Sequence, residues 1–196
     1  MEVPPAERLT RNVKSELMAT VTVACAQHPM IHGLGGRSEK ADALVKSLID
    51  FYWRRKSLLL CGIRTEEGLV CGSFCVDARE DPSLVALARL AWAVTRCAGR
   101  GALGPLLDVE RHKPLFQERH LELAILATVP QAQRLGLAGS LLRFLYREAL
   151  REGYGGIMAV ADQYTPSFGL YLREDFQVER EFEAAGRELC WMRRAV

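Results

Sequence analysis

The residues whose types and spacing point most directly to chemistry are Gln133, Gly136 and Ala138, which separate an apolar run from leucines at helical spacing. The apolar run, residues 123–128, is short enough for a buried strand, and a proline follows it. The first amides of a helix have no partner within the helix and lie at the positive end of its dipole, so they bind anions. Because Gly139 also lacks a side chain, we expect this turn to hold a phosphate group.

The same segment resembles the acyl-CoA-binding motif of the GNAT superfamily of N-acetyltransferases. In that motif a strand ending in Leu-Ala-Val is followed by a proline and by Gln/Arg-x-x-Gly-x-Gly/Ala. The chain has Leu126-Ala127-Thr128 and then Pro130, with Thr128 where the family usually has Val. The resemblance implies that the segment holds the pyrophosphate of acetyl-CoA, whereas the alternative is an ordinary glycine-containing turn. The predicted coenzyme-binding residues here are Leu126, Ala127, Thr128, Gln133, Arg134, Leu135, Gly136, Leu137, Ala138, Gly139 and Ser140.

A second part of the resemblance lies at Leu170-Tyr171 and Asp175-Phe176, where family members usually read Leu-Tyr-x-x-x-Gly-Phe. Asp175 stands in the position of the glycine, so it is expected to make a left-handed turn after this helix. Tyr164, seven residues before the tyrosine, stands where relatives often have an asparagine that contacts the coenzyme. It is therefore a further candidate for coenzyme binding. Together the two motifs cover residues 121–176.

Acetyl transfer to an amine, which the resemblance implies, requires the neutral form of that amine. An ammonium group with a pKa near 10.4 is almost entirely charged at pH 7, so a general base assists. His120 and Glu122 enter the predicted strand two residues apart, so their side chains share one face. Many GNAT enzymes carry a glutamate on this strand, which makes Glu122 the first candidate for the base. His120 is the second, because imidazole titrates near neutral pH; the alternatives are an exposed carboxylate and a structural histidine.

Tyr171 stands at the position of the family's usual acid, which protonates the leaving thiolate of coenzyme A. A phenol suits this role because it keeps its proton at neutral pH. The alternative role of Tyr171 is that of a core aromatic residue on an amphipathic helix. In relatives a main-chain amide of the fourth strand, near residues 126–128, stabilises the oxyanion, and a bulge there would free it. No acyl-enzyme is expected, because Ser140 and the cysteines lack an identifiable base.

The resemblance implies an α/β protein with the GNAT fold, in which helices flank a central mixed, mostly antiparallel, twisted sheet. The coenzyme site would lie where strands four and five splay. We expect one domain over residues 1–196, with the acceptor side mainly in 13–119 and the coenzyme motif and catalytic residues in 120–196. The implied activity is direct acetyl transfer from acetyl-CoA to a primary amine of a small molecule or peptide, by a monomer or homodimer. The alternative is a non-catalytic module that binds or senses acyl-CoA.

The elements that must position these residues follow from apolar periodicity and turn residues. A loop is expected over residues 33–38, and residues 65–68 join two strands as a hairpin. The predicted elements are helices over 15–28, 41–53 and from 137 to about 149; strands over 58–63, 69–76, 123–128 and 156–161; and a terminal hairpin of 176–182 with 187–192.

Residues 81–104 contain a further helical pattern, which several glycines and Pro105 are expected to end. In the family order this segment lies between the third and fourth strands, and it is longer than the minimal family pattern. It either shapes the acceptor pocket or an interface as an insertion, or it simply packs on the sheet.

Composition excludes several other classes of protein. The 196 residues are 49% hydrophobic, which suits one domain with a full core. A net charge of +2 gives no basic field for nucleic acid, so that class of partner is not expected. No apolar run approaches the ~20 residues of a membrane span, and no signal peptide is evident, so we expect a cytoplasmic protein without a membrane partner. The six cysteines are expected to be buried free thiols, and no metal site is predicted.

Overall fold

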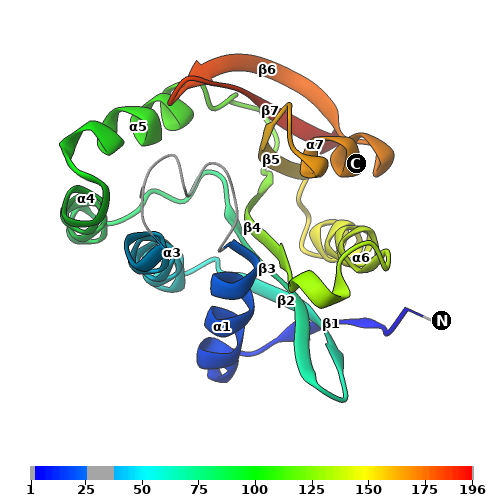
Figure 1. The fold of residues 1–196 in the computed structure, drawn as a ribbon. Coiled ribbons are helices and arrows are strands. Elements are labelled where there is room, and N and C mark those ends of the chain that lie inside the picture. Colours follow the sequence, from blue (N-terminus) through cyan, green and yellow to red (C-terminus); the bar gives the residue numbers. More distant parts are fainter. Residues whose placement is uncertain (1–2, 26–37, 196) are drawn as a thin grey trace.

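The computed structural model describes residues 3–25 and 38–195, which are arranged around one seven-stranded sheet (Figure 1). The strand order is β1-β2-β3-β4-β5-β7-β6, and neighbouring strands are antiparallel except for the parallel pair β4 and β5. The strands are β1 (Ala6–Leu9), β2 (Leu59–Thr65), β3 (Gly68–Asp77), β4 (Leu121–Thr128), β5 (Gly156–Asp162), β6 (Gln177–Ala184) and β7 (Arg187–Ala195). The predicted fold class is therefore confirmed.

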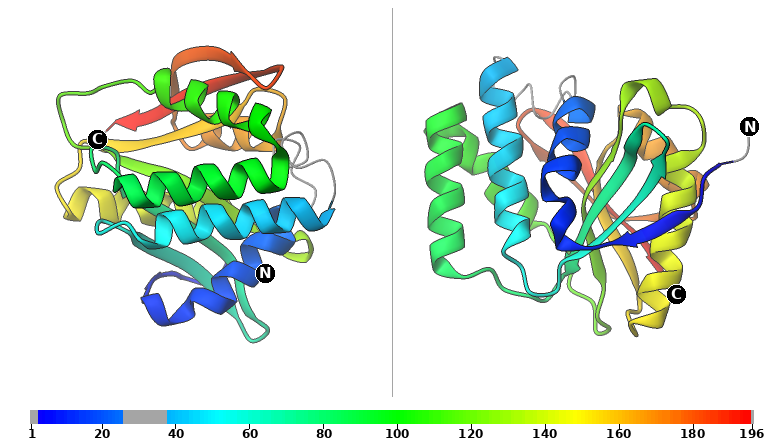
Figure 2. Two further views of the ribbon diagram at one scale, coloured as in Figure 1. Left: turned by 90° about the vertical axis from the view of Figure 1, so that its left-hand side faces the viewer. Right: turned by 90° about the horizontal axis from the view of Figure 1, so that it is seen from below.

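Helices cover both faces of this sheet. On one face α1 and α3 pack against the strands and α4 lies outside α3, whereas α6 covers the other face (Figure 2). The helices are α1 (Lys14–Cys25), α3 (Ser38–Trp53), α4 (Leu84–Ala98), α5 (Leu103–Arg111), α6 (Leu137–Arg151) and α7 (Pro166–Arg173). Short 3-10 turns occur at Arg11–Val13, Arg100–Ala102 and Pro130–Ala132.

The apolar residues that recur at helical spacing in the sequence form a core on each face of the sheet. Leu141, Leu142 and Leu145 of α6 are fully buried against the sheet, as their spacing predicted. On the opposite face Leu17 and Val21 of α1 are equally buried. Each such side chain contributes roughly 1.5–3 kcal/mol by leaving water, which fixes the helices on their faces.

Both predicted hairpins are confirmed. β2 and β3 pair antiparallel up to Thr65 and Gly68, so two glutamates form the loop between them. β6 and β7 pair up to Ala184 and Arg187. In the latter turn Ala185 has φ +55° and Gly186 has φ +67°, the left-handed pair that suits a two-residue hairpin.

Some elements differ from the sequence expectations. Pro105 does not break the helical pattern but lies in the first turn of α5, where its missing N–H costs no hydrogen bond. α3 begins at Ser38, which was expected to belong to a loop. The short edge strand β1 was not predicted. The expected end of the first helix at His28 and the remainder of the loop over residues 33–38 lie outside the described residues.

β4 and β5 separate along their length, and the gap between them is where a site can form. The two strands are in register only from Leu121 to Leu123, opposite Ile157 to Ala159, and then diverge. On its other side β4 contains a bulge, because Leu123 pairs with Cys75 and Ile125 with Phe74, which leaves Ala124 without a partner in β3. Main-chain groups of β4 beyond Leu123 are thus open towards the gap between the strands.

Candidate active site

The predicted phosphate-binding turn connects the end of β4 to the start of α6. After β4 a 3-10 turn begins at Pro130, and Gln133 then turns back, its Nε2 donating to the carbonyl oxygen of Thr128 at 3.1 Å. Arg134 (φ +64°) and Gly136 (φ +78°) both adopt the left-handed conformation. This backbone path places the N-terminus of α6 at the carboxyl end of β4.

The N-terminus of α6 is free to receive an anion. Gly136 is its N-cap, and among the described residues no side chain caps it. A Cβ atom on Gly136 would meet no atom within 4 Å, so this residue borders open space. Glycine is favoured here by the left-handed backbone and not by crowding. The amides of Leu137, Ala138 and Gly139 lack helical acceptors and remain available. Each charge-assisted hydrogen bond to a phosphate oxygen there contributes roughly 1.5–3 kcal/mol.

Not every side chain of the predicted coenzyme set faces this turn. The side chains of Ala127 and Leu137 are buried in the cores, so only their main-chain groups can contribute. Gly139 has a different reason to be glycine, because a Cβ there would lie 2.5 Å from the carboxylate of Glu174. It lets α6 approach the end of α7. Leu126, Ala138 and Ser140 are half-buried, and Arg134 and Leu135 are exposed.

Tyr164 follows β5 and is 76% exposed. Its hydroxyl donates to Oε2 of Glu188 at 2.8 Å, and its amide donates to Oδ1 of Asp162 at 3.0 Å. The Tyr164 side chain is thus engaged with β7. Asp175, which replaces the usual glycine, has φ +63°, so its predicted left-handed conformation is confirmed.

Glu122 lies on β4 opposite Met158 of β5, one residue before the register of the two strands ends. Its side chain is 9% exposed, and its Oε2 accepts a hydrogen bond from Nζ of Lys113 in an ion pair. The alternative of an exposed carboxylate is therefore wrong. Lys113 follows α5 and carried no signal in the sequence that related it to Glu122.

Charged and polar groups from α3 and α5 surround this ion pair. Desolvation raises the pKa of Tyr52 well above its usual value near 10, and the carboxylates of Glu122 and Glu110 add to the shift. Partial burial raises the pKa of Glu110, and the positive charge of Lys113 reduces this increase. Sequence reasoning missed this cluster because its members come from elements that only the tertiary fold brings together.

Tyr171 lies on the other face of the sheet, in the core beneath α6. It is 6% exposed, and its ring packs on Phe176 with 5.1 Å between the centroids. Burial raises the pKa of Tyr171 above its usual value near 10, and the nearby Cys75 adds to this. The phenol therefore keeps its proton throughout the neutral range, as a proton donor must.

His120 precedes β4 and lies away from the gap. Its Nδ1 lies 3.0 Å from the carbonyl oxygen of Glu118, and its ring is tilted against Phe116 at 4.5 Å. The Nε2 atom is buried and has no hydrogen-bond partner within the described part of the chain. This environment resembles that of a structural histidine more than that of a proton carrier.

The arrangement combines a candidate anion site with two candidate groups for proton transfer. The candidate anion site is at the carboxyl end of β4, and Glu122 and Tyr171 flank the separation of β4 and β5 from opposite faces. A sequence profile of the Acetyltransferase (GNAT) family matches residues 45–176. The chain belongs to this family. It is accordingly a GNAT N-acyltransferase, a family that uses acetyl-CoA.

Solved structures of other GNAT proteins share this fold. A histone acetyltransferase HPA2 and related acetyltransferase from Corynebacterium glutamicum has a TM-score of 0.68 and 18% identity, covering 99% of this chain and 97% of that one. An agmatine N-acetyltransferase has a TM-score of 0.69 and 14% identity, covering 97% and 98%. NAA60 of Arabidopsis thaliana, in complex with acetyl-CoA, has a TM-score of 0.57 and 10% identity, covering 97% of each chain. By sequence, no curated protein matches the chain.

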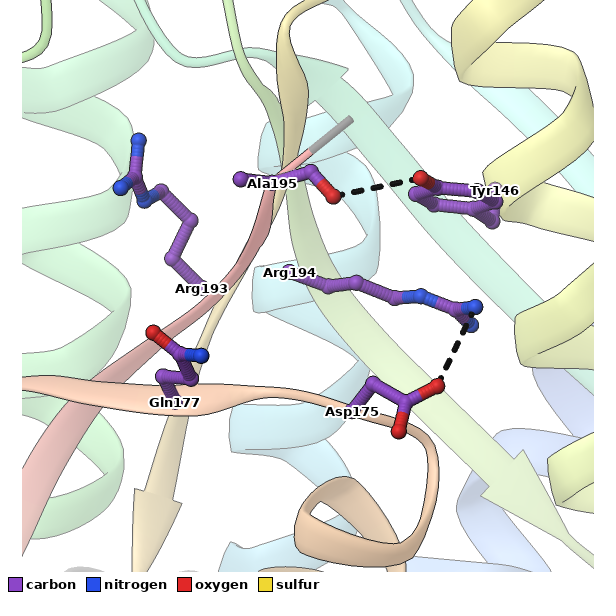
Figure 3. A pocket seen from close by; sticks show the side chains of 6 residues that line it. All are labelled: Tyr146, Asp175, Gln177, Arg193, Arg194 and Ala195. Carbon is purple, nitrogen blue, oxygen red and sulfur yellow. Dashed lines mark hydrogen bonds and ion pairs between the residues drawn. The ribbon is translucent and has the colours of Figure 1, made fainter.

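A pocket of about 240 Å³, lined by two arginines among other residues (Figure 3), lies beside the start of β5, where Ala195 pairs with Gly156. The guanidinium group of one of these arginines, Arg194, lies 4.0 Å from the centre of the Tyr146 ring and 3.5 Å from Oδ2 of Asp175. Tyr146 also donates to the carbonyl oxygen of Ala195 at 3.2 Å. Because these contacts tie β7 to α6 and to the turn after α7, we assign the pocket a structural role in this GNAT fold.

Residues 3–25 and 38–195 show neither a metal-binding cluster nor a membrane-spanning helix. This part of the chain contains no cluster of three or more histidine, cysteine, aspartate or glutamate side chains arranged for a metal ion. None of its helices combines the length and the apolar character needed to cross a membrane. All six cysteines are free thiols; four are buried, and Cys25 and Cys97 are half-buried.

Proposed function

We propose that this GNAT enzyme transfers the acetyl group of acetyl-CoA directly to a primary amine of a small molecule or peptide. The observation that carries the proposal is the divergence of β4 from β5 after Leu123, one residue beyond Glu122, with an uncapped helix N-terminus at the end of the same strand. A long, thin ligand with a phosphate group can follow this path. Its phosphates would meet α6 while its acyl end enters the gap.

The residues at the turn fit a pyrophosphate. The first amides of α6, at Leu137, Ala138 and Gly139, have no acceptor within the helix, and a Cβ on Gly136 would meet no atom within 4 Å. Gln133 and Arg134 are exposed next to them and supply further donors. Tyr164 contributes less than the sequence suggested, because its hydroxyl is bonded to Glu188.

In the proposed reaction Glu122 removes a proton from the ammonium group of the acceptor, directly or through water. The neutral amine attacks the thioester carbonyl, so the C–N bond forms, and the C–S bond then breaks. Tyr171 gives its proton to the sulfur, which leaves as the thiol of coenzyme A, and the second proton that the nitrogen gives up as the amide forms restores the Tyr171 phenol. The oxyanion that forms in between would accept a hydrogen bond from a main-chain amide of β4. The bulge lies at Ala124, two residues before the expected segment 126–128, so we place this amide beside Ala124.

The proposed acceptor is a primary amine, and the proposal covers both small molecules and peptides. One structural neighbour is named for agmatine and another is a histone acetyltransferase HPA2 relative, so this fold serves both kinds of acceptor. The face that carries Glu122 is the proposed acceptor side, and its helices α3 and α5 lie in the segment 13–119 that we expect to form most of that side. A location in the cytoplasm stays a prediction.

A thiol-release assay with acetyl-CoA over a panel of amines and peptides tests the proposal. We expect thiol release that depends on the acceptor and equals the acetylated product in amount. The contradicting result is a folded protein that binds acetyl-CoA and acetylates nothing in a broad panel, as the non-catalytic module would. Equilibrium titration with acetyl-CoA separates that result from a failure to bind.

A further inference from the structure

Lys113 presents a primary amine of the chain itself at the proposed acceptor position. Its side chain lies over the indole of Trp191, with Nζ 5.9 Å from the ring centroid, and Nζ donates to the carboxylate of Glu122. The Lys113 side chain is 16% exposed. An amine is therefore already held on the group that the proposed function uses as the base.

The ion pair between Lys113 and Glu122 lies at the edge of the gap between β4 and β5. Glu122 is opposite Met158, and the register between β4 and β5 ends at the next residue, Leu123. The Nζ atom of Lys113 thus lies on the acceptor face beside the point where the strands separate. An acyl group that enters the gap would meet this amine before any amine from solution.

We propose that Lys113 is an intramolecular acetyl acceptor, so that the enzyme acetylates its own Lys113. The inference rests on the proposed function, because it uses the same base, acid and co-substrate. Glu122 takes a proton from the Lys113 ammonium, and the freed nitrogen attacks the carbonyl carbon of acetyl-CoA. The C–N bond forms, the C–S bond breaks, and Tyr171 protonates the departing sulfur. The second proton, which the nitrogen gives up as the amide forms, restores the Tyr171 phenol. The products are Nε-acetyl-lysine at position 113, which is uncharged, and coenzyme A.

The chain contains a closely matched control lysine. Lys14 forms an ion pair with Asp50, with 2.6 Å between Nζ and Oδ1, and its Nζ lies 5.5 Å from the centroid of the Trp53 ring. It has the same combination of a carboxylate and an indole as Lys113, and it is more exposed, at 38%. Lys14 is on α1 and lacks a neighbouring strand gap. Spontaneous acetylation would favour Lys14, whereas acetylation by the site favours Lys113.

The test uses the full chain incubated with acetyl-CoA and no added acceptor, followed by tryptic digestion and mass spectrometry. Arg111 and Arg119 bracket a peptide whose only lysine is Lys113, so the modification is assigned without ambiguity. We expect this peptide to gain the mass of one acetyl group at least tenfold faster than the Lys14 peptide. The rate per molecule should not change when the protein is diluted, because the step is intramolecular.

Two variants sharpen the test. Lys113→Arg keeps the positive charge beside Glu122 but cannot accept the group in this way, so the mass gain at the 112–119 peptide should disappear. Gly136→Glu should reduce acetylation of Lys113 to the level seen at Lys14, because it blocks the phosphate-binding turn. A mass gain that persists in the Gly136→Glu variant would identify spontaneous chemistry and overturn the proposal.

Failure of this inference and failure of the proposed function give different results. If amines from the panel are acetylated while Lys113 stays unmodified, or is modified no faster than Lys14, the inference is wrong and the proposed function stands. If Lys113 is acetylated through the site while no external amine is, the inference holds and the proposed acceptor class is wrong. A protein that does not bind acetyl-CoA contradicts both.

Discussion

The carboxylate of Glu122 and the phenol of Tyr171 lie on opposite faces of the sheet, on either side of the separation between β4 and β5. Glu122 is in register with Met158, which packs with Trp191 on the α5 side. Tyr171 packs with the leucines of α6 on the other side. A thioester held in the gap is therefore open to a base from one face and an acid from the other, with no need for contact between the two groups.

Gly136→Glu is predicted to abolish acetyl-CoA binding. The new carboxylate would lie beside the free amides of α6 and repel the pyrophosphate at close range. Gly136→Ala is the matched control, because it imposes a similar backbone strain of about 1 kcal/mol at φ +78° without adding charge. Calorimetric titration should show no binding for the Glu variant and measurable binding for the Ala variant. Equal affinity in the folded Glu variant and the parent would refute the assignment of this turn.

Glu122→Gln is predicted to lower turnover by roughly 10²–10⁴ and to change the acidic limb of the pH-rate profile, with little effect on coenzyme affinity. The substitution also leaves the Lys113 ammonium without its partner, which costs stability. A double variant with Lys113→Met removes that unpaired charge and serves as the control for folding. Turnover and profile that both match the parent would transfer the base role to His120, to water or to the acceptor's own equilibrium.

Tyr171→Phe is predicted to reduce turnover markedly, while acetyl-CoA affinity changes by no more than a few-fold. The hydroxyl's main partner, the thiolate, exists only late in the reaction, so its loss affects kcat rather than binding. Stability should change little, because the ring that packs on Phe176 is kept. Steady-state kinetics beside equilibrium binding measure the effect, and full activity in the Phe variant would rule out the acid role.

Stability is predicted to fall as the pH rises above about 8.5. Burial raises the pKa of Cys61 to about 12 and that of Cys71 to about 11, whereas thiols of the unfolded chain ionise near 8.5. Above that pH the unfolded state loses protons that the native state keeps, so the free energy of unfolding decreases. The loss should be about 1–2 kcal/mol per buried thiol at pH 10.

Urea unfolding at pH 7.5 and pH 10, with reductant present, measures this loss. A Cys61→Ala variant should start from lower stability but lose less between the two pH values, since one raised pKa is gone. An identical loss in parent and variant would show that other groups cause the alkaline sensitivity.

The sequence was most informative where local signals agree with one another. The turn at Gly136 combines the end of an apolar run, a glycine in the left-handed conformation and a leucine pattern at helical spacing, and all three are found in the structure. The left-handed conformation of Asp175 could likewise be predicted, because the family that the sequence resembles usually has a glycine at this position. Such features depend on residues close together in the chain.

Features set by tertiary packing could not be predicted in this way. β1 has only four residues and owes its place to the edge of β2. The helical pattern ends at Gly99, the first of the glycines, as expected, but Pro105 lies in the first turn of a second helix, α5, which the sequence did not indicate. The pairing of Lys113 with Glu122 depends on where α5 lies over β7, which no local pattern encodes.

The proposed mechanism requires acetyl-CoA to lie with its pyrophosphate on the first turn of α6 and its thioester in the gap between β4 and β5. A crystal structure of the protein with bound coenzyme would show whether it does. We predict phosphate oxygens on the amides of Leu137 to Gly139 and a sulfur within hydrogen-bond distance of the Tyr171 hydroxyl. A coenzyme bound elsewhere, for example at the Arg194 pocket, or a sulfur remote from Tyr171, would rule out the proposed mechanism.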